Sequence, residues 1–175
     1  MYVTFNLITP FFRHLQYNMK LMFLAIPTNV IYNIRNKKYG KEYRENIMLT
    51  VGIKGREEVI VSERNSAKTM GSGTLDVFAT PSMIALMEQT AWKSVAPHLE
   101  EGWGTVGTLL NVTHDAPTPF GMTVWCESEL VEVDGRRLVF ELAAYDAKGK
   151  IGGGRHERFM IQNEKFQSKA NKKAE

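Results

Sequence analysis

The segment FATPSMIALMEQTAW (78–92) constrains the fold most strongly, because it predicts one long helix with a defined start and end. Thr80 is a good N-cap, and Pro81 suits the first helical position, where its missing N–H costs no hydrogen bond. Pro97 ends the helix, since proline cannot continue one. Apolar residues surround much of the predicted helix, Pro81 to Ala96, which indicates a buried helix instead of a surface one.

Segments typical of β-strands lie on both sides of this helix. They are residues 57–64 before it and residues 103–114, 122–133, 136–146 and 151–164 after it. Asp134 and Gly135 form a strong signal for a two-residue hairpin between two of these strands. One or two short strands, one helix and an antiparallel meander of four long strands predict an α+β fold.

A single helix and a single sheet give a thin core, which has consequences for assembly. A curved sheet wrapped around the helix is the natural way to cover it. Pairing two copies then removes an edge strand or an exposed face from water, so we expect a homodimer.

The first 47 residues differ in character from the predicted domain, which spans residues 48–169. They are apolar and aromatic, but they show no sustained period, and two prolines interrupt them. Basic residues break the apolar run before it reaches the roughly 20 residues that a transmembrane helix needs. A secretory signal is only weakly supported. We expect residues 1–47 to be an ordered extension, a loose arm or upstream sequence translated because Met1 instead of Met48 was taken as the start, and we favour the last.

Charge and cysteine content narrow the classes of partner and compartment. A net charge of +3 is too weak to indicate nucleic-acid binding. Much of the positive excess lies at the C-terminus, where residues 170–175 are expected to form a basic, solvated tail. The single cysteine, Cys126, cannot form an internal disulfide, and its strand setting predicts a packed thiol. We therefore expect a cytoplasmic protein that binds neither nucleic acid nor membranes.

Glu88 interrupts the apolar run of the predicted helix. Ile84 and Ala85 lie one turn before it, and Ala91 and Trp92 lie one turn after it, so all four are its neighbours on the helix surface. A carboxylate among apolar side chains is costly unless it is paired or its pKa is shifted. The residues alone leave two interpretations open: a glutamate held by a salt bridge or backbone donors, and a carboxylate kept dry to act as a base or nucleophile.

Three other residues also have an ordinary and a functional interpretation. The Thr80 hydroxyl either caps the helix or takes part in a reaction. His114 ends the strand on the side predicted for Val106 and Leu110, and it is either a packed imidazole or a proton-transfer group near neutral pH. Gly107 interrupts the same strand, which indicates a bulge or a close approach to the backbone.

The remaining polar and glycine-rich features have mainly structural interpretations. His156 is expected on the same strand face as Arg158, either as a structural hydrogen-bonding group or as a pocket residue. The glycine run 152–154 lacks a P-loop lysine and a following helix, so close packing or a strand bend is expected. Four histidines and one cysteine without close ligand spacing argue against zinc, and we expect no metal and no cofactor.

The ordered motifs AT…ME…VGT…TH…HER resemble those of the hot-dog-fold thioesterases of the fluoroacetyl-CoA thioesterase type. The resemblance covers residues 57–169 and implies a hot-dog fold, in which an antiparallel sheet wraps around one central helix. The residues that the resemblance places in the site are Thr80, Glu88 and His114 as the catalytic set, Gly107 against the acyl thioester and Arg158 near the bound substrate.

The function implied by the resemblance is hydrolysis of a short or modified acyl-CoA to the free acid and CoA, with either Glu88 or Thr80 as the nucleophile. Fluoroacetyl-specific members carry two aromatic gate residues ahead of the threonine. Gly71 and Thr74 occupy the matching positions here and cannot exclude water in the same way, which leaves the acyl group open. The alternatives are a non-catalytic acyl-CoA-binding hot-dog protein and a hot-dog hydroxyacyl-thioester dehydratase.

Overall fold

A computed structural model describes residues 49–174 of the chain. The expected N-terminal extension, residues 1–47, lies outside the described residues. The helices and strands are, in chain order, β1 (Lys54–Ile60), η2 (Glu63–Asn65), α3 (Thr80–Val95), η3 (Ala96–His98), β2 (Trp103–His114), β3 (Thr123–Asp134), β4 (Arg137–Asp146), β5 (Gly149–Gln162) and α4 (Asn163–Asn171). The predicted α+β class is confirmed.

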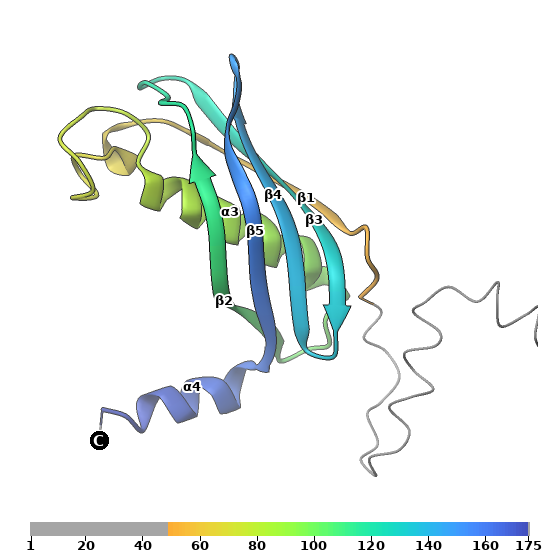
Figure 1. Ribbon diagram of the computed structural model, residues 1–175. Helices are drawn as coiled ribbons and strands as arrows, with labels where there is room; N and C mark the ends of the chain where they lie inside the picture. The colour runs from red at the N-terminus through yellow and green to blue at the C-terminus, as the bar shows by residue number, and fades with distance from the viewer. Residues whose placement is uncertain (1–48, 175) are drawn as a thin grey trace, which may run out of the picture. The chain divides into compact units, whose positions relative to one another are not determined.

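Five strands form one antiparallel sheet in the order β1-β3-β4-β5-β2, and the sheet curves around α3 (Figure 1). The predicted meander is confirmed for β3, β4 and β5 but is wrong for β2. This strand pairs with β5 at one edge of the sheet, and the chain then crosses to β3. Alternating side chains reveal the two faces of a strand, but they do not reveal which strand lies beside it.

The two ends of the described region also differ from the prediction. β1 lies at Lys54–Ile60 instead of 57–64, and the segment expected to continue the last strand and the tail contains α4. α4 has no buried residue, and its glutamate, lysines and alanine favour helix without tertiary packing. Between residues 49 and 174, no helix is long and apolar enough to cross a membrane.

The N-cap prediction for Thr80 is wrong by one position. Ala79 is the N-cap of α3 and makes no side-chain capping bond, Thr80 is the first helical residue, and Pro81 is the second. The Thr80 hydroxyl is therefore not used by the helix terminus and is available to other partners.

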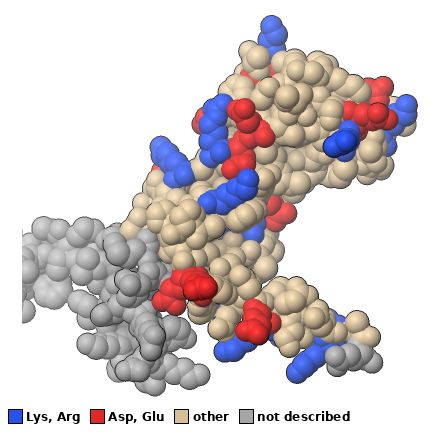
Figure 2. All heavy atoms as spheres, turned by 180° about the vertical axis from the view of Figure 1, so that it is seen from behind, with Lys and Arg blue, Asp and Glu red and all other residues tan. Residues whose placement is uncertain are grey.

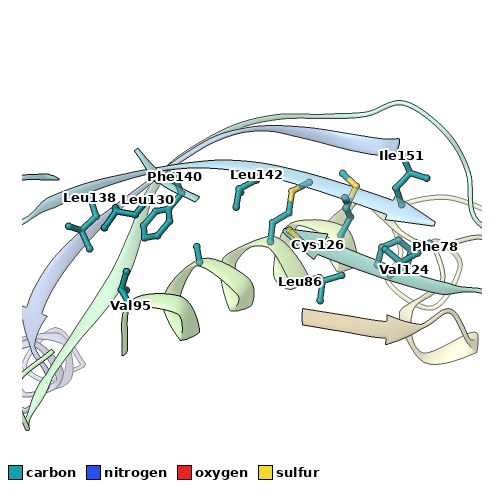
Figure 3. Close-up of a cluster of buried hydrophobic side chains, with 14 of the residues drawn as sticks. Phe78, Leu86, Val95, Val124, Cys126, Leu130, Leu138, Phe140, Leu142 and Ile151 are labelled. Carbon is teal, nitrogen blue, oxygen red and sulfur yellow. The ribbon is translucent and has the colours of Figure 1, made fainter. Parts of the chain in front are cut away.

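α3 buries one face against the sheet and leaves the other open. The buried residues of α3 are Met83, Leu86, Met87, Thr90, Ala91 and Val95. Figure 3 shows Val95 at the end of the cluster that holds Leu130 and Leu138, and Leu86 at the end that holds Val124. Each fully buried side chain of this size contributes roughly 1.5–3 kcal/mol. The expected burial around most of the helix is wrong for a single chain, because one sheet can cover only one face.

β2 contains a bulge that reverses its side-chain alternation. Its register with β5 shifts between Gly107 and Leu109, which leaves Thr108 as the extra residue. Gly107 faces α3, and beyond the bulge Leu110 and Val112 pack against the core. The prediction that Val106 shares a side with His114 is therefore wrong.

The glycine run in β5 provides close packing, as predicted. A Cβ on Gly153 would lie 2.6 Å from the Leu142 carbonyl oxygen on β4, and one on Gly152 would collide with the Thr113 carbonyl on β2. Gly154 has φ +147°, a backbone angle that favours glycine. At these three positions, backbone atoms of the neighbouring strands occupy the space that a Cβ atom would need.

Charges are interspersed on the surface. On the face shown in Figure 2, acidic and basic side chains lie together in small groups. Ion pairs also join neighbouring strands, as between Arg137 Nε and Glu157 Oε2 at 2.8 Å. Because opposite charges lie beside one another, neither sign dominates the electrostatic potential of this face.

Candidate active site

Thr80 and His114 meet where α3 begins and β2 ends, and we call this pair the helix-start cluster. Thr80 Oγ1 and His114 Nδ1 are 2.9 Å apart. Thr80 is exposed, whereas His114 Nε2 is buried and has no hydrogen-bond partner among residues 49–174. With Nδ1 as the acceptor, the hydroxyl donates to an imidazole that is able to take its proton.

The environment keeps His114 in its neutral form. Burial lowers the pKa of His114 below its ordinary value of 6.5, and contacts with the Ala116 backbone and the Asp115 charge oppose this shift more weakly. A neutral imidazole at pH 7 is the form that can act as a base.

Two loops fix the start of α3 beside His114. The Phe78 N–H donates to the Thr118 carbonyl at 2.9 Å, and the Phe78 ring packs edge-on against His114 with 6.4 Å between ring centroids. The buried Thr118 hydroxyl in turn donates to the Asp146 carboxylate at 2.8 Å. The backbone that carries Thr80 is thus anchored to the far end of β4.

Glu88, Gly107 and Arg158 form a second group further along the helix, which we call the mid-helix cluster. Arg158 Nη1 lies 3.5 Å from Glu88 Oε1, and the two side chains are 6% and 39% exposed. The carboxylate among apolar neighbours is therefore paired with a buried guanidinium, and its other side is open to solvent. Burial lowers the pKa of Arg158, and the charge of Glu88 opposes the shift.

Gly107 lies directly against the Glu88 carboxylate. A Cβ at this position would collide with Glu88 Oε1 and would lie 3.2 Å from His156 Cε1. Both features expected of this glycine, a bulge and a close approach, are therefore present. A side chain here would displace the carboxylate.

Arg158 is oriented by two residues of the sheet. Its Nε donates to Thr105 Oγ1 and its Nη2 to the Thr105 carbonyl, each at 2.8 Å. Its Nη1 lies 3.0 Å from His156 Nε2, and His156 Nδ1 lies 2.8 Å from the Leu109 carbonyl. The expected structural hydrogen bond of His156 is confirmed. Thr105 was not predicted, although its place two residues before Gly107 puts both on one face of β2.

The structure does not bring the two clusters together within one chain. Thr80 and Glu88 are eight residues apart on one helix, which corresponds to about 12 Å. Gly107 and His114 are separated by roughly 20 Å of extended strand. One thioester carbonyl carbon cannot touch both clusters, so the joint catalytic role of the predicted set remains a prediction.

Cys126 plays no part in either cluster. It is fully buried, and burial raises the pKa of its thiol to about 11. A thiol in this state is not a nucleophile at neutral pH, which confirms the predicted packed cysteine.

Comparisons with known proteins agree with the fold. Residues 61–164 match the family described as fluoroacetyl-CoA-specific thioesterase. The fluoroacetyl-CoA thioesterase of Streptantibioticus cattleyicolor is 47% identical over 98 residues, which cover 56% of this chain and 70% of that protein.

Solved structures extend the comparison. A mutant fluoroacetyl-CoA thioesterase in complex with acetyl-CoA is 36% identical, with a TM-score of 0.69 over 73% of this chain and 100% of that chain. A hot-dog-like protein from Thermanaerovibrio acidaminovorans is 23% identical, with a TM-score of 0.66 over 73% of this chain and 95% of that chain. The latter likeness concerns the fold alone, and it confirms the predicted hot-dog architecture.

Proposed function

The chain belongs to the fluoroacetyl-CoA-specific thioesterase family and is an acyl-CoA thioesterase, and we propose that it hydrolyses a short or modified acyl-CoA through Thr80, Glu88 and His114. The contact of 2.9 Å between Thr80 Oγ1 and His114 Nδ1 supports this proposal most directly. In this contact the exposed Thr80 hydroxyl, which makes no helix-capping bond, lies within hydrogen-bond distance of the neutral His114 imidazole.

The proposed reaction has two steps. His114 takes the Thr80 proton as the hydroxyl oxygen attacks the thioester carbonyl carbon, and the Gly107 N–H stabilises the carbonyl oxygen. The carbon–sulfur bond breaks, and the proton passes from His114 to the departing CoA thiolate. Glu88 then takes a proton from a water molecule that attacks the Thr80 ester, and the released Thr80 oxygen regains that proton. The products are the free acid and CoA.

The separation of the clusters leads us to propose a homodimer whose site spans both copies. On the open face of α3, Ala85 and Trp92 flank Glu88, and Trp92 is 43% exposed. The neighbouring strand β2 is a sheet edge on which Leu109 is 48% exposed. A long open edge beside exposed apolar side chains favours pairing with another copy.

In this dimer, Thr80 and His114 of one copy face Glu88 and Gly107 of the partner subunit. Arg158 is buried against Thr105 and Glu88, so we propose that it acts on the substrate through the carboxylate that it holds. The mass of the particle in solution tests the assembly. Twice the chain mass is expected, and a monomer that is fully active would contradict it.

The acyl preference is proposed to differ from that of the fluoroacetyl-specific relative. Gly71 and Thr74 lie exposed in the loop before α3, where neither supplies an aromatic ring. A site without such rings has little means of excluding water around a fluoromethyl group. We expect kcat/KM for fluoroacetyl-CoA to lie within about tenfold of that for acetyl-CoA.

One experiment tests the proposed activity. Purified protein is incubated with a panel of acyl-CoA esters while free thiol is followed. Steady-state thiol release that is abolished by both Glu88→Gln and Thr80→Ala supports hydrolysis, with at most one equivalent of thiol per chain released by Glu88→Gln in the first turnover. A dehydrated acyl product without free thiol would indicate a hydroxyacyl-thioester dehydratase, and binding without turnover would indicate a non-catalytic acyl-CoA-binding protein.

A further inference from the structure

His156 is fully buried, and both of its ring nitrogens are engaged. Nδ1 lies 2.8 Å from the Leu109 carbonyl oxygen, and Nε2 lies 3.0 Å from Arg158 Nη1. A carbonyl only accepts and a guanidinium only donates, so the hydrogen is on Nδ1 and Nε2 is bare. These partners fix His156 as a neutral imidazole of one tautomer.

The groups around the ring explain why it stays neutral. Glu88 on α3 and Arg158 on β5 are the charged side chains that approach it, with Glu88 Oε1 at 3.9 Å from Nε2, and β2 and β4 contribute Gly107 and the Phe140 ring. Burial lowers the pKa of His156, and the Arg158 charge lowers it further, whereas Leu109 and Glu88 oppose the shift. A proton on Nε2 would remove the acceptor and set two cations side by side.

The same Arg158 nitrogen connects His156 to the reacting carboxylate. Nη1 lies between His156 Nε2 at 3.0 Å and Glu88 Oε1 at 3.5 Å, while Thr105 holds Nε and Nη2. Without the bare Nε2, the guanidinium would lose the partner that directs Nη1 into the cluster. A shift of about 1 Å in a catalytic group is able to reduce a rate by about 10²-fold.

His156 also holds the backbone on the other side of Glu88. Its Nδ1–H bonds to Leu109, the residue at which the register of β2 resumes after the bulge. That bulge follows Gly107, whose backbone lies against the carboxylate. One buried ring therefore contacts both structures that confine Glu88: the guanidinium and the bulged strand.

From these contacts we infer that His156 is a positioning residue for hydrolysis, whose bare Nε2 directs Arg158 so that Glu88 is held against Gly107. The inference rests on the proposed function of Glu88. It assigns to the buried histidine a role in the rate that is separate from its contribution to packing.

Two substitutions separate the contacts of His156. In His156→Gln the amide oxygen takes the place of Nε2 and keeps an acceptor for Arg158, whereas in His156→Asn the amide keeps only the contact with Leu109. We expect kcat to fall less than about threefold in the glutamine variant and about 10–100-fold in the asparagine variant, with KM little changed in both. The exposed His98→Gln is the matched control and should leave kcat unchanged.

Measurement of the wild-type ring makes the test independent of how well the variants fold. Nitrogen-15 NMR of His156 should show hydrogen on Nδ1 and a bare Nε2 across pH 6–8. A protonated Nε2, or folded glutamine and asparagine variants with equal kcat, would overturn the inference. Glu88→Gln is assayed alongside. If Glu88→Gln retains wild-type thiol release, the proposed function fails. If Glu88→Gln is inactive but both His156 variants are fully active, only the positioning role of His156 fails.

Discussion

The two clusters on α3 are held in place by different means. The helix-start cluster consists of an exposed hydroxyl and a neutral imidazole, and backbone hydrogen bonds from two loops position it. The mid-helix cluster consists of a carboxylate that is fixed by a buried guanidinium and by a glycine with no room for a side chain. The first depends on loop anchoring, and the second depends on charge and close packing.

This difference fits the separate roles that we propose for the two clusters. A neutral hydrogen-bonded pair suits proton transfer between a nucleophile and its base. The Glu88 carboxylate, 3.5 Å from the Arg158 guanidinium, is drawn toward the sheet by the attraction of opposite charges. Neither cluster supplies all the groups that hydrolysis needs, which is the reason for proposing that two copies share a site.

Removal of the Thr80 hydroxyl is expected to have the largest effect. Thr80→Ala should reduce kcat for acyl-CoA hydrolysis by about 10³-fold, because His114 then has no hydroxyl to activate. Thr80→Ser keeps the hydroxyl and should retain activity within about tenfold. Thiol release measures both variants, and equal activity of Ala and Ser variants would show that the helix-start cluster carries no chemistry.

Gly107→Ala probes the close packing of the mid-helix cluster. The added methyl group collides with Glu88 Oε1, so kcat should fall by about 10²-fold and the free energy of unfolding by about 1–3 kcal/mol. Gly73→Ala is the control, since its added Cβ would meet only the Ala67 Cβ, at 3.3 Å. Kinetics together with urea unfolding check both quantities. A fully active Gly107→Ala enzyme would contradict the proposed catalytic role of Glu88.

Thr118→Val tests whether loop anchoring positions Thr80. The substitution deprives the buried Asp146 carboxylate of the Thr118 donor and should lower the free energy of unfolding by about 1–3 kcal/mol. We expect kcat to fall by about threefold to tenfold as the start of α3 loosens. Thr123→Val, at an exposed position of β3, is the control. Loss of stability without any loss of kcat would show that the anchor serves the fold alone.

The smallest expected effect is a shift in the pH profile. His114 must be neutral to act as a base, so activity is present above its pKa and is lost as the pH falls through it. Since burial lowers this pKa, the acid limb of kcat/KM should lie below pH 6.5. Asp115→Asn removes a charge that raises the pKa of His114, so the limb should move to lower pH. A limb that moves upward would exclude His114 as the titrating base.

Much of this arrangement could be predicted from the residues. Proline and periodicity located α3 to within a residue or two, and alternation located β2 to β5. Glu88 stood out because a carboxylate among apolar neighbours requires a partner, and Gly107 stood out because glycine weakens a strand. In both cases a local energetic conflict marked the residue.

Features set by distant parts of the chain could not be predicted in this way. The pairing of β2 with β5 and the bulge at Thr108 depend on how two strands about 50 residues apart align. The bulge moved Val106 to the opposite face from the one predicted. The separation of Thr80 from Glu88 follows from simple helix geometry. Its consequence for the site depends on a second copy, which we propose to pair with the open face of α3 and the edge strand β2.

The most direct test of a site shared between two copies is complementation in a mixed dimer. Thr80→Ala and Glu88→Gln chains are co-expressed with different tags, and the particle that carries both tags is isolated and assayed for thiol release. A shared site leaves one intact site per mixed dimer, so about half of the wild-type activity should return although each parent is inactive. A doubly tagged dimer as inactive as its parents would contradict the shared site.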